Sequence, residues 1–107
     1  MAVQHVVLFK FPEQLSPADE DAMRRAVGSF GEHIGEATRL RFGADTGGGR
    51  TQGYTYLLLS EFPDESALQR YRDHPVHRDF LDWLAEQDAT LLGFDYSLDE
   101  QTVLIPE

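Results

Sequence analysis

Residues 3–11, VQHVVLFKF, decide the fold, because they are predicted to form a strand with apolar side chains on both faces. One face then holds Val3, His5, Val7, Phe9 and Phe11, and the other holds Gln4, Val6, Leu8 and Lys10. A second strand of this kind is predicted over residues 54–62, YTYLLLSEF. Since an antiparallel sheet with one covered face usually alternates apolar and polar residues, these strands predict a sheet that is covered on both faces.

The rest of the chain adds helices and strands around these two. Ser16 followed by Pro17 has the pattern of a helix cap and first helical residue, and Pro75 ends one helix and starts the next. The other expected elements are a helix over 17–30, a strand over 38–42, a short helix after Pro63, a helix from Pro75 and a strand over 89–96. This βαββαβ order predicts an α+β, ferredoxin-like subunit with its helices on one side of the sheet.

A lone subunit of this fold would leave an apolar patch uncovered. We expect the patch to comprise His5, Val7, Phe9, Tyr54, Tyr56 and Leu58. Two-fold pairing of two such sheets would cover it, so a homodimeric α/β barrel is predicted. The carboxy-terminal tail, residues 97–107, contains the apolar run 103–105 and is expected to pack on the partner subunit.

The composition limits the number of domains and the kinds of partner. A length of 107 residues predicts one domain over residues 1–107, and the absence of cysteine excludes disulfides. With 19 acidic and 9 basic residues, the formal charge of −10 disfavours nucleic acid and anionic membranes as partners. No apolar segment is long enough to span a bilayer and the amino terminus reads as a strand, so a cytoplasmic protein is expected.

His33 and His74 are expected to have ordinary structural roles, and the spacing of His74 and His77 is a weak signal for a metal site. His33 lies among polar neighbours at a helix end and is expected to face solvent. His74 directly precedes Pro75 and is expected to begin the following helix. His74 and His77 have the spacing His-x-x-His, but no third ligand stands at an obvious spacing, so no metal site is predicted.

His5, Tyr56, Tyr71 and His77 form the one convergent polar set that the predicted fold places in an apolar enclosure. A histidine and a tyrosine at inward strand positions favour a ligand cavity over a purely apolar core. Burial of His77 would favour the neutral imidazole, which can act as a general base near pH 7. The alternatives are that His77 is a core histidine and that Tyr71 only packs its ring.

Three segments resemble the stress-responsive dimeric α/β-barrel (Dabb) family: residues 5–11 HVVLFKF, residues 71–77 YRDHPVH and residues 92–96 LGFDY. The resemblance extends over about residues 2–96 and is greatest to the olivetolic acid cyclase-like branch of the family. It implies a ferredoxin-like subunit whose sheet packs on that of a twin. It also implies the reaction of that branch, in which linear poly-β-ketoacyl chains are closed by intramolecular aldol condensation without cofactor or metal.

The resemblance further implies roles for residues of this chain. His77 would be the general base, Tyr71 would hold or polarise a ketone oxygen, and His5 would lie beside the pocket. Tyr56 stands where the branch has a histidine. The apolar residues expected around the substrate are Val7, Phe9, Met23, Val27, Leu58 and Phe80.

The resemblance, taken with the polar set, implies a cofactor-independent, lyase-type cyclase that acts on a small poly-β-keto substrate by general-base aldol chemistry. One alternative is a non-catalytic dimeric stress-response protein whose cavity binds a small apolar ligand. Another is a haem-dependent or monooxygenase-type barrel protein, which purified protein would reveal by absorbance in the visible region.

Overall fold

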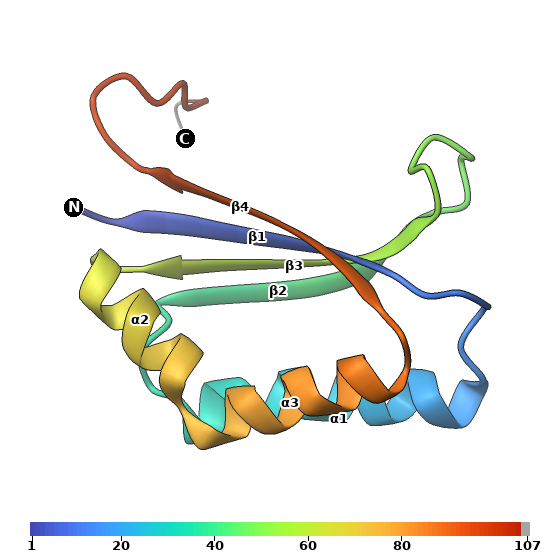
Figure 1. Cartoon of the computed structure of the whole chain (residues 1–107). Coiled ribbons are helices and arrows are strands. Elements are labelled where there is room, and N and C mark those ends of the chain that lie inside the picture. Colours follow the sequence, from blue (N-terminus) through green and yellow to red (C-terminus); the bar gives the residue numbers. More distant parts are fainter. Residues whose placement is uncertain (106–107) are drawn as a thin grey trace.

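A computed structural model describes residues 1–105 of the chain as a four-stranded sheet with three helices (Figure 1). In chain order the elements are β1 (Val3–Lys10), α1 (Pro17–His33), β2 (Arg39–Ala44), β3 (Tyr54–Phe62), α2 (Glu65–Asp73), α3 (Pro75–Glu86) and β4 (Thr90–Ser97). The predicted βαββαβ order is confirmed, with α1 ending at His33 rather than at Phe30.

Every strand of the sheet is antiparallel to its neighbours, and the strand order is β2-β3-β1-β4. All three helices lie on one side of the sheet, as the ferredoxin-like arrangement requires (Figure 1). The register places His5 of β1 opposite Ser60 of β3 and opposite Asp95 of β4. Ser60 and Asp95, both far from His5 in the sequence, are therefore its direct neighbours in the sheet.

Side-chain caps start the helices where the sequence predicts them. The Ser16 hydroxyl accepts a hydrogen bond from the Asp19 N–H at 3.1 Å, and Pro17 follows as the first helical residue. His74 caps α3, because its Nδ1 accepts a hydrogen bond from the Val76 N–H at 3.1 Å. The structural role predicted for His74 is therefore confirmed.

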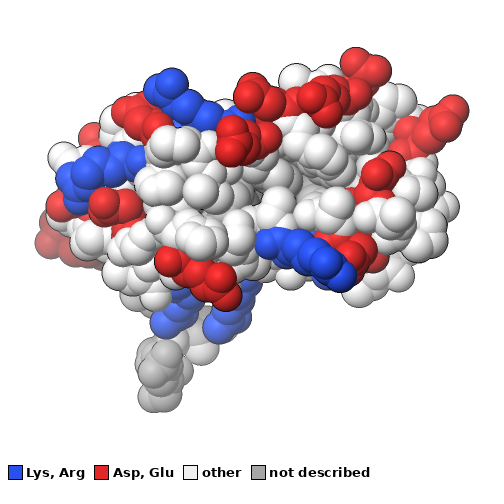
Figure 2. Space-filling model, turned by 90° about the horizontal axis from the view of Figure 1, so that it is seen from below, with Lys and Arg blue, Asp and Glu red and all other residues white. Residues whose placement is uncertain are grey.

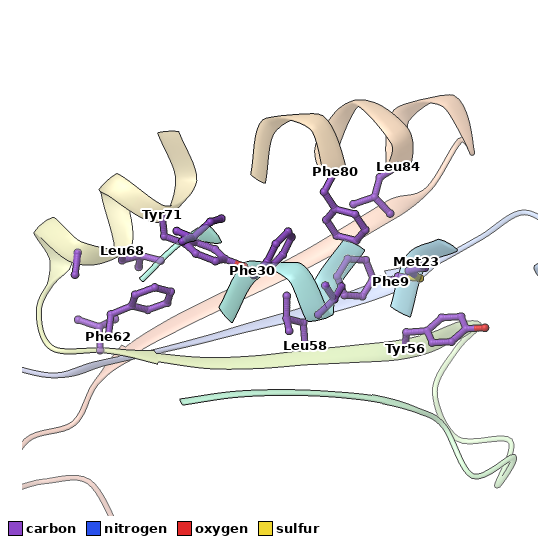
Figure 3. Close-up of a cluster of buried hydrophobic side chains, with 14 residues drawn as sticks. Phe9, Met23, Phe30, Tyr56, Leu58, Phe62, Leu68, Tyr71, Phe80 and Leu84 are labelled. Carbon is purple, nitrogen blue, oxygen red and sulfur yellow. The ribbon is translucent and has the colours of Figure 1, made fainter. Parts of the chain in front are cut away.

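The apolar core lies between the sheet and the helices (Figure 3). Aromatic rings run through its centre, with Phe30 of α1 in edge contact with Tyr71 at 5.7 Å and with Phe80 at 5.5 Å between ring centroids. Phe9 of β1 meets the Phe80 ring from the sheet side at 6.1 Å. These contacts fix α2 and α3 over the middle of the sheet.

The prediction of which strand residues need cover was wrong. His5, Val7, Phe9, Tyr56 and Leu58 lie on the helix side, where Phe9 is 1% and Leu58 is 2% exposed. Tyr54, the sixth residue of the predicted patch, does not share that side, because a register shift after Phe9 pairs it with Lys10. The residues left without cover are on the other side of the sheet, which we call the open face: Val6, Leu8, Leu57, Leu59, Leu92, Phe94 and Tyr96. Alternation separates the two faces but cannot tell which one the helices cover when both are apolar.

Residues beyond β4 carry further exposed apolar side chains. Val103 is 94%, Leu104 is 71% and Ile105 is 90% exposed. The tail was predicted over 97–107, and residues 106–107 lie outside the described part of the chain. Within residues 1–105, no helix combines the length and the apolar character needed to cross a membrane.

Candidate functional site

A cavity of about 270 Å³ lies between the sheet and the helices α2 and α3. It is lined by His5, Val7, Phe9, Leu58, Tyr71, Arg72, His77, Phe80, Leu81, Leu84, Leu91 and Gly93. Leu81 of α3 is 39% exposed, and Leu91 of β4 is 41% exposed. The cavity therefore opens to solvent between α3 and β4.

His77 lies in the first turn of α3 and is only 8% exposed. Its Nδ1 is 3.2 Å from the carbonyl oxygen of Arg72. A carbonyl can only accept, so Nδ1 carries the proton and the Nε2 lone pair is free. Burial lowers the pKa of His77, and the hydrogen bond to the Arg72 carbonyl offsets only part of this effect. The ring is therefore neutral near pH 7 and can accept a proton at Nε2.

Tyr71, at the end of α2, lies against His77 with 4.5 Å between the ring centroids. Its side chain is 1% exposed, and burial raises the pKa of Tyr71, so the hydroxyl keeps its proton. Within residues 1–105 this hydroxyl is the single buried side-chain polar atom that has no hydrogen-bond partner. An unpartnered buried group of this kind costs about 1–3 kcal/mol, so the oxygen atom of a ligand is a fitting partner.

His5 contributes a third polar group to the wall. Its Nδ1 forms a hydrogen bond with Oδ1 of Asp95, which lies opposite on β4. The second carboxylate oxygen of Asp95 accepts a hydrogen bond from Nη2 of Arg72 at 2.6 Å. Burial opposes ionisation of Asp95, but the bonds from His5 and Arg72 outweigh it and lower the pKa of Asp95. Asp95 is therefore a carboxylate that links β1, β4 and α2.

The structure brings together three of the four residues in the predicted polar set. His5, Tyr71 and His77 line the cavity, as do the predicted apolar residues Val7, Phe9, Leu58 and Phe80. Met23 and Val27 do not line it, because α1 holds them in the closed core at 0% and 2% exposure.

Tyr56 also lies outside the cavity. It is four residues before Ser60, the neighbour of His5, which separates the two positions by about 13 Å along β3. Its hydroxyl donates to Oε2 of Glu20 at 2.6 Å. Burial and this bond raise the pKa of Tyr56 to about 12. Tyr56 therefore joins β3 to α1 instead of facing a ligand.

Sequence reasoning missed Arg72, Asp95 and Gly93. Asp95 has the strand parity of an inward residue, but only the register of β4 on β1 places it beside His5. Gly93 lies opposite Val7, and a Cβ atom added there would meet no atom within 4 Å. The missing side chain therefore leaves open space at the cavity mouth.

The surroundings of the site are described by the charges on the helix side and by the side chains that could bind a metal ion. Figure 2 shows the helix side, where acidic groups are spread over the surface and basic groups are fewer. With a formal charge of −10, this surface does not attract polyanions. No cluster of three or more His, Cys, Asp or Glu side chains suited to a metal occurs in residues 1–105.

Comparisons with known proteins agree with this architecture. The sequence model of the stress responsive A/B barrel domain, Dabb, matches residues 3–98. Olivetolic acid cyclase from Cannabis sativa is 28% identical over 98 residues, which cover 91% of this chain and 97% of that protein.

Solved structures share the fold. Hydroxynitrile lyase from Passiflora edulis superposes with a TM-score of 0.81 at 20% identity, covering 95% of this chain and 97% of the other. A dimeric ferredoxin-like protein of unknown function from Thermobifida fusca gives a TM-score of 0.73 at 26% identity, covering 88% and 90% of the two chains. These structures confirm the ferredoxin-like α+β fold.

Proposed function

The chain belongs to the stress responsive A/B barrel (Dabb) family, and from this premise we propose that it is a cofactor-independent enzyme that uses His77 and Tyr71 on a small poly-β-keto substrate. The observation that carries the proposal is the unpartnered hydroxyl of Tyr71, buried beside a neutral histidine in an apolar cavity. A packing role alone does not account for a buried donor that lacks an acceptor.

The proposed chemistry is an intramolecular aldol condensation. Nε2 of His77 removes a proton from a CH₂ group between two carbonyls, and the resulting enolate oxygen accepts a hydrogen bond from Tyr71. The enolate carbon then attacks a second carbonyl of the same chain, which the apolar walls hold in a folded conformation. Positioning of this kind lowers a barrier by several kcal/mol, on the order of 7–11 in the best-oriented cases.

The size of the cavity bears on the substrate. A volume of about 270 Å³ lies near the lower end of ligand pockets, which suits a short chain rather than a long one. The walls are apolar except for His5, Tyr71, Arg72 and His77. The similarity to olivetolic acid cyclase supports the same substrate class, a linear poly-β-ketoacyl chain.

Product analysis with a linear poly-β-keto thioester tests the proposal. An uncharged carrier such as N-acetylcysteamine suits a protein with a formal charge of −10. The wild type is expected to redirect spontaneous lactones toward an aromatic ring, whereas Tyr71→Phe and His77→Ala should give the mixture seen without enzyme. Tyr54→Phe and His33→Ala are matched controls away from the cavity and should behave as the wild type.

Two outcomes would overturn the proposal. If the wild-type mixture equals the enzyme-free control while the protein binds the thioester as tightly as His77→Ala does, the cavity is a binding site without catalysis. If purified protein carries a visible absorbance band, a haem-type function replaces the cyclase.

We also propose that the protein works as a homodimer joined through the open face. The apolar character of that face supports this, and so does the T. fusca neighbour, which is described as dimeric. The exposed run 103–105 is proposed to pack on the partner subunit. A chain that ends at Thr102 is therefore expected to dissociate at higher protein concentration than the full chain, as sedimentation velocity would measure.

A further inference from the structure

His5 is a buried histidine that has no role in the reaction proposed for His77 and Tyr71. It is 7% exposed and lines the cavity, with 6.3 Å between its ring centroid and that of Tyr71. The partner of its Nδ1 is a carboxylate oxygen of Asp95, which can only accept, so Nδ1 carries a proton. Any proton that His5 exchanges with a ligand must therefore move through Nε2.

Arg72 governs the orientation of both histidines at the cavity. Its backbone carbonyl accepts the hydrogen bond from Nδ1 of His77. Its guanidinium holds the second oxygen of Asp95, whose first oxygen holds His5. Asp95 comes from an exposed edge strand, so the contact from α2 restrains a carboxylate that β4 alone would leave free to rotate.

We propose that Arg72 is a positioning residue which, through Asp95, makes His5 a second proton-transfer group that acts opposite His77. The substrate part of this proposal rests on the proposed function, whereas the positioning of His5 does not. The cavity then contains two histidines whose Nδ1 atoms are both hydrogen-bonded, and the Nε2 atom of each is available for proton transfer.

The protons of the aldol step balance with these two groups. His77 takes the proton from the carbon atom, and the electron pair of that C–H bond becomes the new C–C bond. The attacked carbonyl oxygen gains negative charge and takes a proton from Nε2 of His5 in its doubly protonated form. His77 then loses its proton to water and His5 regains one, so the substrate has exchanged one C–H for one O–H.

The groups that face His5 come from every element around it. They are Asp95 of β4, Tyr71 and Arg72 of α2, and His77 of α3. From β3 the Ser60 hydroxyl approaches the His5 carbonyl oxygen at 3.5 Å and does not titrate. Asp95 is thus the one anion in direct contact with His5 among residues 1–105.

Imidazole ¹⁵N NMR of the ligand-free protein tests the positioning without any assay of activity. In the wild type, the neutral His5 ring should carry its proton at Nδ1, because Nδ1 is bonded to the Asp95 carboxylate. Arg72→Met should give a mixture of the two neutral forms of His5, and Arg72→Lys should restore the wild-type pattern in part. His77 should be unaffected in both variants, because its Nδ1 is bonded to the backbone of Arg72 and not to its side chain.

Arg70→Met is the matched control, since Arg70 lies on the same helix and pairs with Glu36 on the surface at 2.9 Å. It should leave the His5 signals as in the wild type. Identical His5 spectra for Arg72→Met and Arg70→Met would overturn the positioning role.

Kinetics test the proton transfer itself. His5→Gln should lower kcat by on the order of 10²-fold or more, and Arg72→Met by up to about 10²-fold, with little change in KM. A rise in KM at unchanged kcat would contradict proton transfer by His5. If the wild type turns over no poly-β-keto thioester, the proposed function fails, and the NMR spectra still decide whether Arg72 positions His5.

Discussion

Tyr71 carries a hydroxyl that the subunit does not need for its own stability. The oxygen is buried without a partner among residues 1–105, whereas the ring packs between Phe30, Phe62 and His77. We expect Tyr71→Phe to leave the free energy of unfolding unchanged or to raise it by up to about 1 kcal/mol. Urea denaturation measures this, with Tyr54→Phe as the control. A loss larger than about 1 kcal/mol would mean that the hydroxyl has a partner inside the protein.

His77 makes the stability of the fold depend on pH. Burial lowers its pKa below the usual value near 6.5, so the unfolded chain binds the proton more readily than the native state does. Its contribution to the free energy of unfolding is therefore complete above about pH 6.5 and declines as the pH falls toward the lowered value.

Denaturation at pH 7.5 and at pH 5.5 should show a smaller difference for His77→Gln than for the wild type. His33→Gln changes an exposed histidine and should keep the wild-type difference. An equal pH dependence in all three proteins would show that His77 is not buried in its neutral form.

Candidate site residues were selected from the sequence by the strand face they occupy and by sequence motifs. His5, Tyr71 and His77 could be selected as inward polar groups, and all three line the cavity. Tyr56 has the correct face but lies too far along β3, because alternation gives no position along a strand. Asp95 was missed for a related reason, since its contact with His5 depends on the register of two strands 90 residues apart.

At the scale of elements, the break between α2 and α3 builds the site. Tyr71 ends one helix and His77 begins the next, and His74 between them caps α3 through Val76. Removal of the cap in His74→Ala should lower the free energy of unfolding by about 1 kcal/mol, and His74→Asn should retain most of it.

Chemical denaturation of the two His74 variants separates a cap from a side chain that only fills space. If His74 acts as a cap, His74→Asn should have a clearly higher free energy of unfolding than His74→Ala. If both variants lose the same amount, the hydrogen bond to the Val76 N–H does not contribute.

Helix starts were predicted well, because caps and prolines are local signals in the sequence. The orientation of the strands was predicted poorly, because the sequence fits either face equally. Caps and prolines locate α1 and α3 closely, because they act within one turn. The uncovered patch was predicted on the face of β1 and β3 that the helices in fact cover. The error arose because both faces of these strands are apolar. Only the packing of the helices distinguishes the faces, and packing is not a local property.

At the scale of the whole molecule, β4 is the least supported part of the site. It is an edge strand that is exposed along its entire length, with β1 as its neighbour in the sheet. Its inward residues Leu91 and Gly93 line the cavity, and Asp95 holds His5. Its outward residues Leu92, Phe94 and Tyr96 belong to the open face. A partner subunit on the open face would therefore hold one side of the site in place.

The proposed support of β4 by a partner subunit yields a prediction for Phe94, which is 65% exposed in the single subunit. Phe94→Glu places a charge where the proposed interface would bury it, and a buried unpaired charge is too costly to keep the dimer together. Light scattering at micromolar concentration should give a dimer for the wild type and a monomer for the variant, with unchanged far-UV circular dichroism. Ala85→Glu, an equal charge on the helix side, should remain dimeric.

The monomeric variant should also bind and turn over substrate less well, because β4 then lacks its outer support while Asp95 still depends on it. A wild type that is monomeric at these concentrations would contradict the proposed assembly. A monomeric Phe94→Glu protein with full activity would show instead that one subunit is sufficient, and that Arg72 alone holds Asp95 in place.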